Sequence, residues 1–319
     1  GAVHANGAIY YGSGSALVFN GDVSSTLNIT SPQDNGQGPW TTKNDNTTFN
    51  SQKTTNAPSV TVTLNMTNSH FLIDIPPAGE DSMSSTGQQR LYNQAQMVMI
   101  ITNSTVANGN PTVMLTLQTG ANGVVPGADL SKVLLTLTNA NPANLSTNFS
   151  FLSLTNSFYD QRELKTNIIT DIDVGKLATW IATNSTVQGK IPPAAGAYPT
   201  ILYVADRRSG TTSQPGQLSV VRLNNGAQLP SNGGLGFSVA TQNPLYVDGN
   251  YNTKIAGSAG SSAATTNTAY TVPAALLSDS LTILASTWTD AASKTKSNTY
   301  SDGNSAFDAT DTTINAAII

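Results

Sequence analysis

The chain has 319 residues, of which 38% are hydrophobic and only 10% are charged, and its formal net charge is -4. It contains no cysteine, which excludes disulfides and thiolate metal sites. Its 14 basic residues are scattered, which argues against nucleic acid as a partner, since a phosphate-binding face needs clustered Lys and Arg. The nearest thing to a basic cluster is Arg207-Arg208, which we interpret as a solvated turn. No run of about 20 apolar residues is present, so we expect no membrane span in this chain.

The low charge leaves solubility to Ser, Thr, Asn, Gln and Gly. A surface of hydroxyl and amide groups responds little to salt or pH, because few of its groups titrate. Such a surface suits a protein that faces an uncontrolled external medium. The composition therefore favours a secreted or cell-surface location.

The first third of the chain indicates short strands between turns. Residues 8–11 and 16–19 are β-prone runs, and Asn20-Gly21 after them predicts either a tight hairpin or the corner of a solenoid coil. Residues 31–57 are polar and rich in turn formers, which predicts a long loop. Residues 59–64 alternate with a period of two and predict a half-buried strand, and an apolar run at 71–75 follows them.

The middle of the chain predicts longer strands and a helix. The apolar run at 94–101 suits a central strand, and residues 112–117 alternate again. A helix is predicted over 174–183, with Asp173 as its N-cap and with Leu177, Trp180 and Ile181 on its core-facing side.

A second helix is predicted over 273–290. Pro273 fits a first helical turn. A stripe at spacings of four, three and four is typical of one helix face, and its members are Leu277, Leu281, Leu284 and Trp288.

Between the two predicted helices, four β-prone runs occur at 200–204, 218–223, 236–240 and 244–247. Short β runs alternate with Asn, Asp and Gly corners over 235–252, as they do in a solenoid coil, although the chain shows no strict repeat. The fold class is therefore expected to be mainly β with a few helices, and a β-solenoid or β-helix with an α/β insertion is one form that fits.

We expect three regions along the chain. Residues 1–75 form an N-terminal β region, and residues 76–215 form a central α/β region. Residues 216–319 form a C-terminal β region with one helix.

Eight sequence blocks carry a resemblance to a known group of proteins. They occur in the order 89–95 (QRLYNQA), 158–163 (FYDQRE), 170–174 (TDIDV), 203–208 (YVADRR), 221–226 (VRLNNG), 243–252 (NPLYVDGNYN), 273–279 (PAALLSD) and 313–317 (TINAA). The set resembles large uncharacterised bacterial envelope proteins that are associated with a PilX-like, type IV pilin-type N-terminus. The resemblance implies export and a pilus or surface filament. The chain departs from it by lacking the hydrophobic N-terminal helix through which pilin-like proteins pack.

The sequence contains few residues in patterns that are typical of catalytic sites. A Ser-His-Asp site would need one of the two histidines, His4 or His70, and no Gly-x-Ser-x-Gly elbow is present. Asp171 and Asp173 would face one side of a strand, as a pair of glycosidase carboxylates could, but helix capping and ion pairing explain them as well. β-Helix lyases line their clefts with basic and acidic residues together, and the sequence shows no such cluster. We assign no catalytic residue and expect no enzyme.

Calcium is the ion that the side chains suit best, because the sequence is rich in oxygen donors. Asp302, Asn304 and Asp308 form a candidate site on a turn-rich loop, and Asp248, Asn250 and Asn252 form a second group of donors. Neither group matches the twelve-residue calcium loop, and ordinary Asp- and Asn-rich turns explain both. No other cofactor is expected.

Trp40 lies in a Gly- and Pro-rich loop and is the candidate ligand-binding residue, since an exposed aromatic ring can stack on a sugar. Three functions follow from these observations. The first is a structural subunit of a pilus-like fibre, surface filament or surface layer, formed by self-association into a homopolymer through edge strands. The second is a surface adhesin or carbohydrate-binding protein whose partners are surface glycans. The third is a polysaccharide-active enzyme that uses Asp171 or Asp173.

Overall fold

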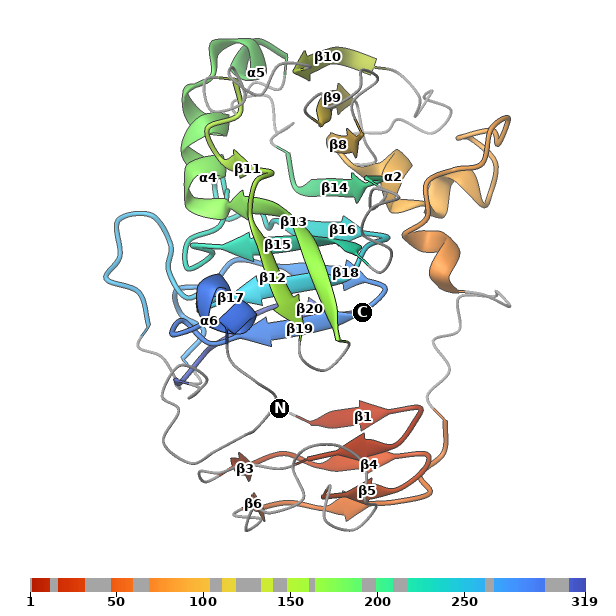
Figure 1. Cartoon of the computed structure of the whole chain (residues 1–319), viewed down its shortest axis with the longest axis vertical. Helices are drawn as coiled ribbons and strands as arrows, with labels where there is room; N and C mark the ends of the chain where they lie inside the picture. The colour runs from red at the N-terminus through yellow and green to blue at the C-terminus, as the bar shows by residue number, and fades with distance from the viewer. Residues whose placement is uncertain are drawn as a thin grey trace. The chain divides into compact units, whose positions relative to one another are not determined.

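The computed structural model describes twelve segments of the chain, which are residues 2–11, 17–31, 47–59, 69–103, 111–118, 133–139, 148–160, 164–190, 199–208, 217–261, 267–295 and 310–319. The chain divides into two compact units. The first holds residues 1–67 and 296–304, and the second holds residues 68–295 and 305–319. Strands predominate over helices in the described residues (Figure 1), which confirms the mainly β prediction.

The first unit consists of short strands in parallel sheets. Its strands are β1 (Val3–Ala5), β2 (Ile9–Tyr10), β3 (Leu17–Phe19), β4 (Val23–Ser25), β5 (Ile29–Thr30), β6 (Thr47–Phe49) and β7 (Lys53–Thr54). They form three parallel sheets, β1-β4-β7, β2-β5 and β3-β6, so the chain visits the three sheets in the same order twice. Paired residues lie 20 positions apart in β1/β4, as in Val3 with Val23, and 30 apart in β3/β6, as in Leu17 with Thr47.

The strands of the first unit test two predictions, the turn at Asn20-Gly21 and the long loop over 31–57. The turn at Asn20-Gly21 joins β3 to β4, which belong to different sheets, so it is a corner and not a hairpin. The long loop predicted over 31–57 is wrong in its later part, because β6 and β7 lie there. Their sequences are polar, and their strand partners, β3 and β4, lie earlier in the chain, where no local pattern reveals them. Most of the strand predicted over 59–64 lies outside the described residues.

The second unit contains two larger sheets. The seven-stranded sheet has the order β10 (Val133–Asn139), β9 (Thr112–Gln118), β8 (Met97–Thr102), β14 (Ile201–Asp206), β16 (Ser238–Thr241), β18 (Ala275–Ser278), β20 (Ala317–Ile318). The six-stranded sheet has the order β11 (Leu152–Ser153), β13 (Lys165–Asp173), β15 (Leu218–Asn224), β17 (Leu245–Asp248), β19 (Leu281–Leu284), with β12 (Ser157–Asp160) also on β13. From β13 to β20 the chain alternates between the two sheets, and within each sheet these strands pair in parallel.

The main core lies between these sheets. Leu223 and Val247 from one sheet and Val204 and Val239 from the other belong to a single buried cluster. The strands predicted near 94–101, 112–117, 200–204, 218–223, 236–240 and 244–247 are all present as strands of this unit. The segment 235–252 contains β16 and β17 in different sheets with a corner between them. This matches the alternation that suggested a coil, and the solenoid itself stays a prediction.

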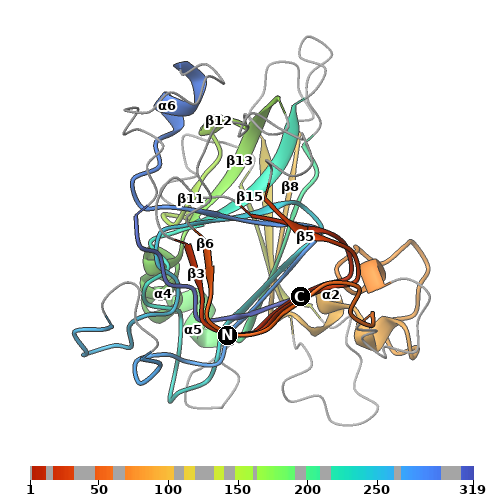
Figure 2. The same ribbon diagram turned by 90° about the horizontal axis from the view of Figure 1, so that it is seen from below.

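The unit also has short helices. They are η1 (Ser69–Leu72), η2 (Gly87–Gln89), α2 (Leu91–Gln94), α4 (Val174–Thr183), α5 (Ser185–Lys190) and α6 (Asp290–Thr295). Helices α4 and α5 lie on the opposite side of this unit from α2 (Figures 1 and 2). In the described segments, no helix has the length and apolar character needed to cross a membrane.

The helix predicted over 174–183 is confirmed as α4. The Asp173 carboxylate accepts a hydrogen bond of 2.9 Å from the Lys176 N–H, as an N-cap does. Leu177, Trp180 and Ile181 are buried in the main core. Cap and apolar stripe are both local signals, so the sequence carried all the information that this helix needs.

The helix predicted over 273–290 is wrong, because the segment forms β18 and β19. Leu277 and Leu284 are buried in two different clusters, and Leu281 packs at the edge of the main core. The three leucines therefore do not form one helix face. A spacing of four and three also arises when a corner separates two short strands. The apolar run at 71–75 is likewise not a strand, since η1 and a turn occupy it.

Candidate functional site

The residues predicted to bind a ligand or calcium lie outside the described residues. These are Trp40 for ligand binding and Asp302, Asn304 and Asp308 for calcium, so both sites stay predictions. The described segments hold no group of three or more His, Asp or Glu side chains that could bind a metal ion.

The second group of oxygen donors has structural partners. Asn252 is 1% exposed, and its amide donates to the carbonyls of Val272 and Asn315, each at 2.7 Å. The Asn250 Oδ1 accepts from the Thr313 N–H at 2.8 Å. Both asparagines therefore connect residues 250–252 to the last described segment of the chain, which begins at residue 310. The ordinary-turn interpretation fits them.

The six-stranded sheet carries a buried charge network on its outer face. Asp171 on β13 lies in register with Arg222 on β15. The Arg222 guanidinium donates to Asp171 at 2.6 Å and to Asp290 of α6 at 2.6 Å, and both side chains of the first pair are at most 7% exposed. Asn156 and Asn224 donate to the same Asp171 carboxylate, at 2.7 Å and 2.6 Å.

The network shifts the ionisation of its members. Burial acts to lower the pKa of Arg222, and the hydrogen bonds to Asp171 and Asp290 outweigh it, so the pKa is raised. Burial raises the pKa of the neighbouring Asp248 carboxyl; Arg222 opposes that effect, and the charges of Asp171 and Asp290 add to it. Acidic and basic groups therefore do gather here, contrary to the expectation from the sequence. Their contacts are with one another, and the structure gives the network a role in holding β13, β15 and α6 together.

Asp173, the other carboxylate named as a catalytic candidate, also has a structural partner, because it caps α4. Asp160 on β12 accepts from the Tyr246 hydroxyl at 2.8 Å. Arg208, interpreted as solvated, is 8% exposed, and its guanidinium binds Asp206 at 2.6 Å. The solvated-turn interpretation is therefore wrong for Arg208, because its guanidinium is buried against the Asp206 carboxylate.

The two histidines lie apart. The His4 ring contacts the Ser24 hydroxyl at 2.8 Å and the Asn6 amide oxygen at 3.0 Å, and the imidazole is exposed. His70 contacts Asp74 at 2.9 Å and Asp279 at 3.1 Å, with its side chain 43% exposed. An exposed imidazole acts in a high-dielectric medium, where hydrogen bonds add little to catalysis.

Exposed apolar side chains gather on terminal strands of the sheets. β19 and β20 are the last strands of the two sheets of the second unit, and Ile283, Ile318 and Ile319 are 48%, 55% and 64% exposed there. β1, β2 and β3 begin the three sheets of the first unit, and Val3, Tyr10 and Val18 are 39%, 58% and 46% exposed on them. Six of the ten exposed large apolar residues in the described segments therefore lie on or beside such strands. These two sets are the terminal-strand surfaces.

The sequence predicted edge strands as the interface, but the segment of β19 was assigned to a helix. The apolar run at 316–319, which includes β20, was the one local signal for this surface.

Searches of known protein families, curated proteins and solved structures found no match to this chain. The resemblance to envelope proteins with a pilin-type N-terminus therefore stays a prediction.

Proposed function

We propose that the protein is an extracellular structural subunit that self-associates into a filament or surface layer. The terminal-strand surfaces carry this proposal. A terminal strand offers unpaired backbone groups to another chain, and proteins that remain monomeric usually protect such strands with charge or proline. The sequences of β19 (LTIL) and β20 (AI) contain neither.

The partner surface that fits is on a second copy. β19 and β20 of one copy would pair with β1, β2 and β3 of the next, because both surfaces belong to parallel sheets and both expose apolar side chains. Two different surfaces on one chain make a head-to-tail contact, which produces an open fibre when the rotation does not close a ring. The contact would be a case of strand addition between identical subunits.

The magnitude of the apolar term makes this assembly sensitive to single changes. Burying one large apolar side chain contributes roughly 1.5–3 kcal/mol. Association costs about 4–15 kcal/mol of free energy before any contact forms. A few buried isoleucines and valines therefore offset much of the cost of association. Replacing one of them with lysine should make association unfavourable.

The direct test is electron microscopy of the protein isolated from its source, followed by sedimentation of the purified chain. Regular filaments or sheets are expected for the parent. The double variant Ile283→Lys, Ile318→Lys should remain monomeric at concentrations where the parent assembles.

Leu235→Lys is the matched control, because Leu235 is 40% exposed but lies in a loop and not on a terminal strand. This variant should assemble like the parent. A parent that stays monodisperse in both experiments contradicts the proposal, and equal loss of assembly in the control shows that net charge and not the terminal strands controls it.

A further inference from the structure

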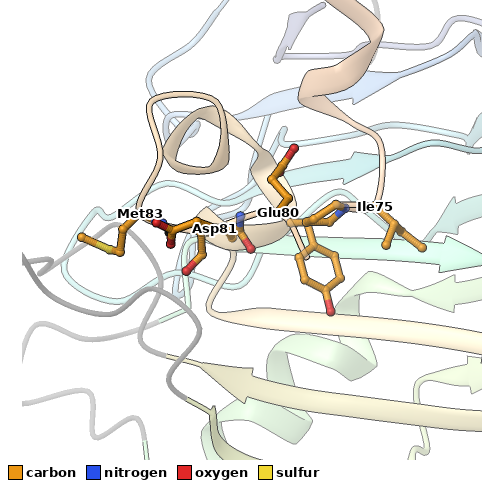
Figure 3. Close-up of a pocket in the computed structure, with 8 residues that line it drawn as sticks. Ile75, Glu80, Asp81 and Met83 are labelled. Carbon is orange, nitrogen blue, oxygen red and sulfur yellow. Dashed lines mark hydrogen bonds between the residues drawn. The ribbon is translucent and has the colours of Figure 1, made fainter. Parts of the chain in front are cut away.

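A cavity of about 560 Å³ opens beside α2 in the second unit (Figure 3). Its walls come from residues 75–76, 80–83 and 92–93. The volume lies within the range of about 300–1,000 Å³ that is usual for small-molecule sites. No function described above uses this cavity.

The wall of the cavity is held by a buried ion pair. Arg90 is 6% exposed, and its guanidinium donates to both carboxylate oxygens of Glu80 and to the Phe71 carbonyl at 2.7 Å. The same guanidinium lies over the Phe71 ring, 5.5 Å from its centroid. Arg90 therefore fixes Glu80 and neutralises its charge.

Gly87 lets the 81–83 turn close against η2. A Cβ at this position would lie 2.2 Å from the Asp81 carbonyl oxygen and 2.8 Å from the Ser82 Cα. The Gln88 amide donates to the Met83 carbonyl at 2.7 Å, which holds the end of the same turn. The wall is therefore fixed in place before any ligand binds.

The cavity presents polar atoms that the fold does not satisfy. Asn93 is 6% exposed, and its Nδ2 donates to the Gly87 carbonyl at 2.8 Å. In the described part of the chain, no donor reaches the Asn93 Oδ1, and the hydroxyls of Tyr92 and Ser82 make no hydrogen bond. None of these three atoms is among the fully buried polar atoms without a partner in the described segments, so a ligand hydroxyl can reach them from the cavity.

The charge and shape of the lining select the class of ligand. Ile75, Pro76 and Met83 provide apolar surface, and the Tyr92 ring is held edge-on against Tyr203 with centroids 5.3 Å apart. The lining contains no Lys or Arg, and the Asp81 carboxylate accepts from the Met83 N–H at 2.9 Å with its second oxygen left over. Anions are therefore disfavoured, whereas a molecule that has both hydroxyls and an apolar face is favoured.

From these contacts we propose that the cavity binds a neutral sugar ring of a glycan. One sugar hydroxyl donates to the Asn93 Oδ1, and a second exchanges hydrogen bonds with the Tyr92 and Ser82 hydroxyls. The apolar face of the ring packs on the apolar part of the lining that Ile75 and Pro76 provide. This site goes beyond the structural function and does not depend on assembly.

The test is an array of neutral and anionic glycans probed with the full chain, followed by titration calorimetry with the neutral glycan that binds best. The double variant Tyr92→Phe, Ser82→Ala removes two hydroxyl groups and no carbon atom, so the fold should persist. A thermal unfolding curve of the variant checks this. We expect its affinity to fall by about tenfold, as the loss of two ordinary hydrogen bonds predicts.

Tyr270→Phe is the matched control, since Tyr270 lies in a turn of the second unit, does not line the cavity and is not part of the terminal-strand surfaces. It should bind like the parent. Three results overturn the proposal: no neutral glycan bound at millimolar concentration, preference for anionic glycans, or unchanged affinity in a correctly folded double variant. Filament formation is measured separately, so failure of this site and failure of the proposed assembly are distinguishable.

Discussion

The two units show two ways of holding parallel β-strands together. In the first unit the strands are two or three residues long, and contacts between side chains on successive turns connect them. Phe19 stacks on Phe49 with centroids 5.0 Å apart, and the Asn50 amide donates to Asn20 at 2.7 Å. In the second unit most strands are longer, and a continuous apolar core lies between two sheets.

Charge is also distributed differently between the units. The second unit contains the buried pairs Asp171–Arg222, Asp206–Arg208 and Glu80–Arg90. In the first unit, the charged side chain of Asp22 makes an exposed contact with Ser51. In both units, contacts between neighbouring strands hold the sheets together, but the groups that make them differ and include aromatic rings, amides, leucines and ion pairs. We therefore expect the two units to respond differently to the same kind of change.

The largest effect is expected from breaking the charge network in the second unit. Arg222→Met keeps most of the side-chain volume but leaves Asp171 buried without its counter-ion. Breaking a buried pair in this way costs about 3–5 kcal/mol of unfolding free energy. Chemical denaturation should show this loss in the transition of the second unit, with the first unit unchanged.

Two further variants make that result specific. The triple variant Arg222→Met, Asp171→Asn, Asp290→Asn removes all three charges, so most of the lost stability should return. Lys176→Met breaks the ion pair of Lys176 with Asp173, in which the Lys176 side chain is 64% exposed. This variant should change stability by less than about 1 kcal/mol. A loss for Arg222→Met no larger than that of Lys176→Met would mean that the network does not support the fold.

A smaller effect is expected from the aromatic ladder of the first unit. Phe49→Ala removes the stacked contact with Phe19 and the edge contact with Tyr11, whose centroid is 5.3 Å away. Each aromatic pair is worth about 0.5–1.5 kcal/mol beyond its buried area. Hydrogen exchange should therefore show the loss of about 1–3 kcal/mol of protection in β3 and β6 and no change in β13 or β15.

Leu27→Ala is the control for this prediction, because Leu27 is 55% exposed, and its loss should change protection by less than about 0.5 kcal/mol. Reduced protection in both units after Phe49→Ala would contradict the view that each unit has a separate core.

These differences explain which parts of the structure the sequence could predict. Helix α4 was predictable because its cap and its apolar face lie within ten residues of each other. The β18 and β19 strands were not, because their pairing partners lie in β16 and β17, and a local pattern of leucines fits a helix equally well. The repeat of the first unit was hidden because its spacing changes from 20 to 30 residues within two turns.

The charge network was hidden for the same reason. Asp171 and Arg222 are 51 residues apart, and only the register of β13 with β15 brings them together. The cavity beside α2 depends on the absence of a side chain at Gly87 and on the ion pair of Arg90 with Glu80. Neither the charge network nor the cavity follows from a periodic pattern or a motif. The sequence therefore predicted a polar surface but did not locate these two features.

The smallest effect, and the most direct comparison of the two units, concerns pH. Burial raises the pKa of Asp248 above its ordinary value of 3.8. A raised pKa in the folded state means that this group stabilises the fold below pH 3.8, and that the contribution is lost as the pH rises through the raised value. Asp248→Asn should match the parent in acid and be more stable at neutral pH, by less than about 1 kcal/mol because the group is only half-buried.

Asp22 in the first unit should show the opposite sign. Its hydrogen bond from the Ser51 hydroxyl, followed by that from the Gln52 N–H, lowers its pKa below 3.8. This group stabilises the fold above pH 3.8, and the contribution is lost as the pH falls through the lowered value. Asp22→Asn should therefore be less stable than the parent at neutral pH and equal to it in strong acid. Hydrogen exchange measured for each unit at neutral pH and in strong acid separates the two effects. If both variants changed stability in the same direction at neutral pH, burial and not hydrogen bonding would control both carboxylates.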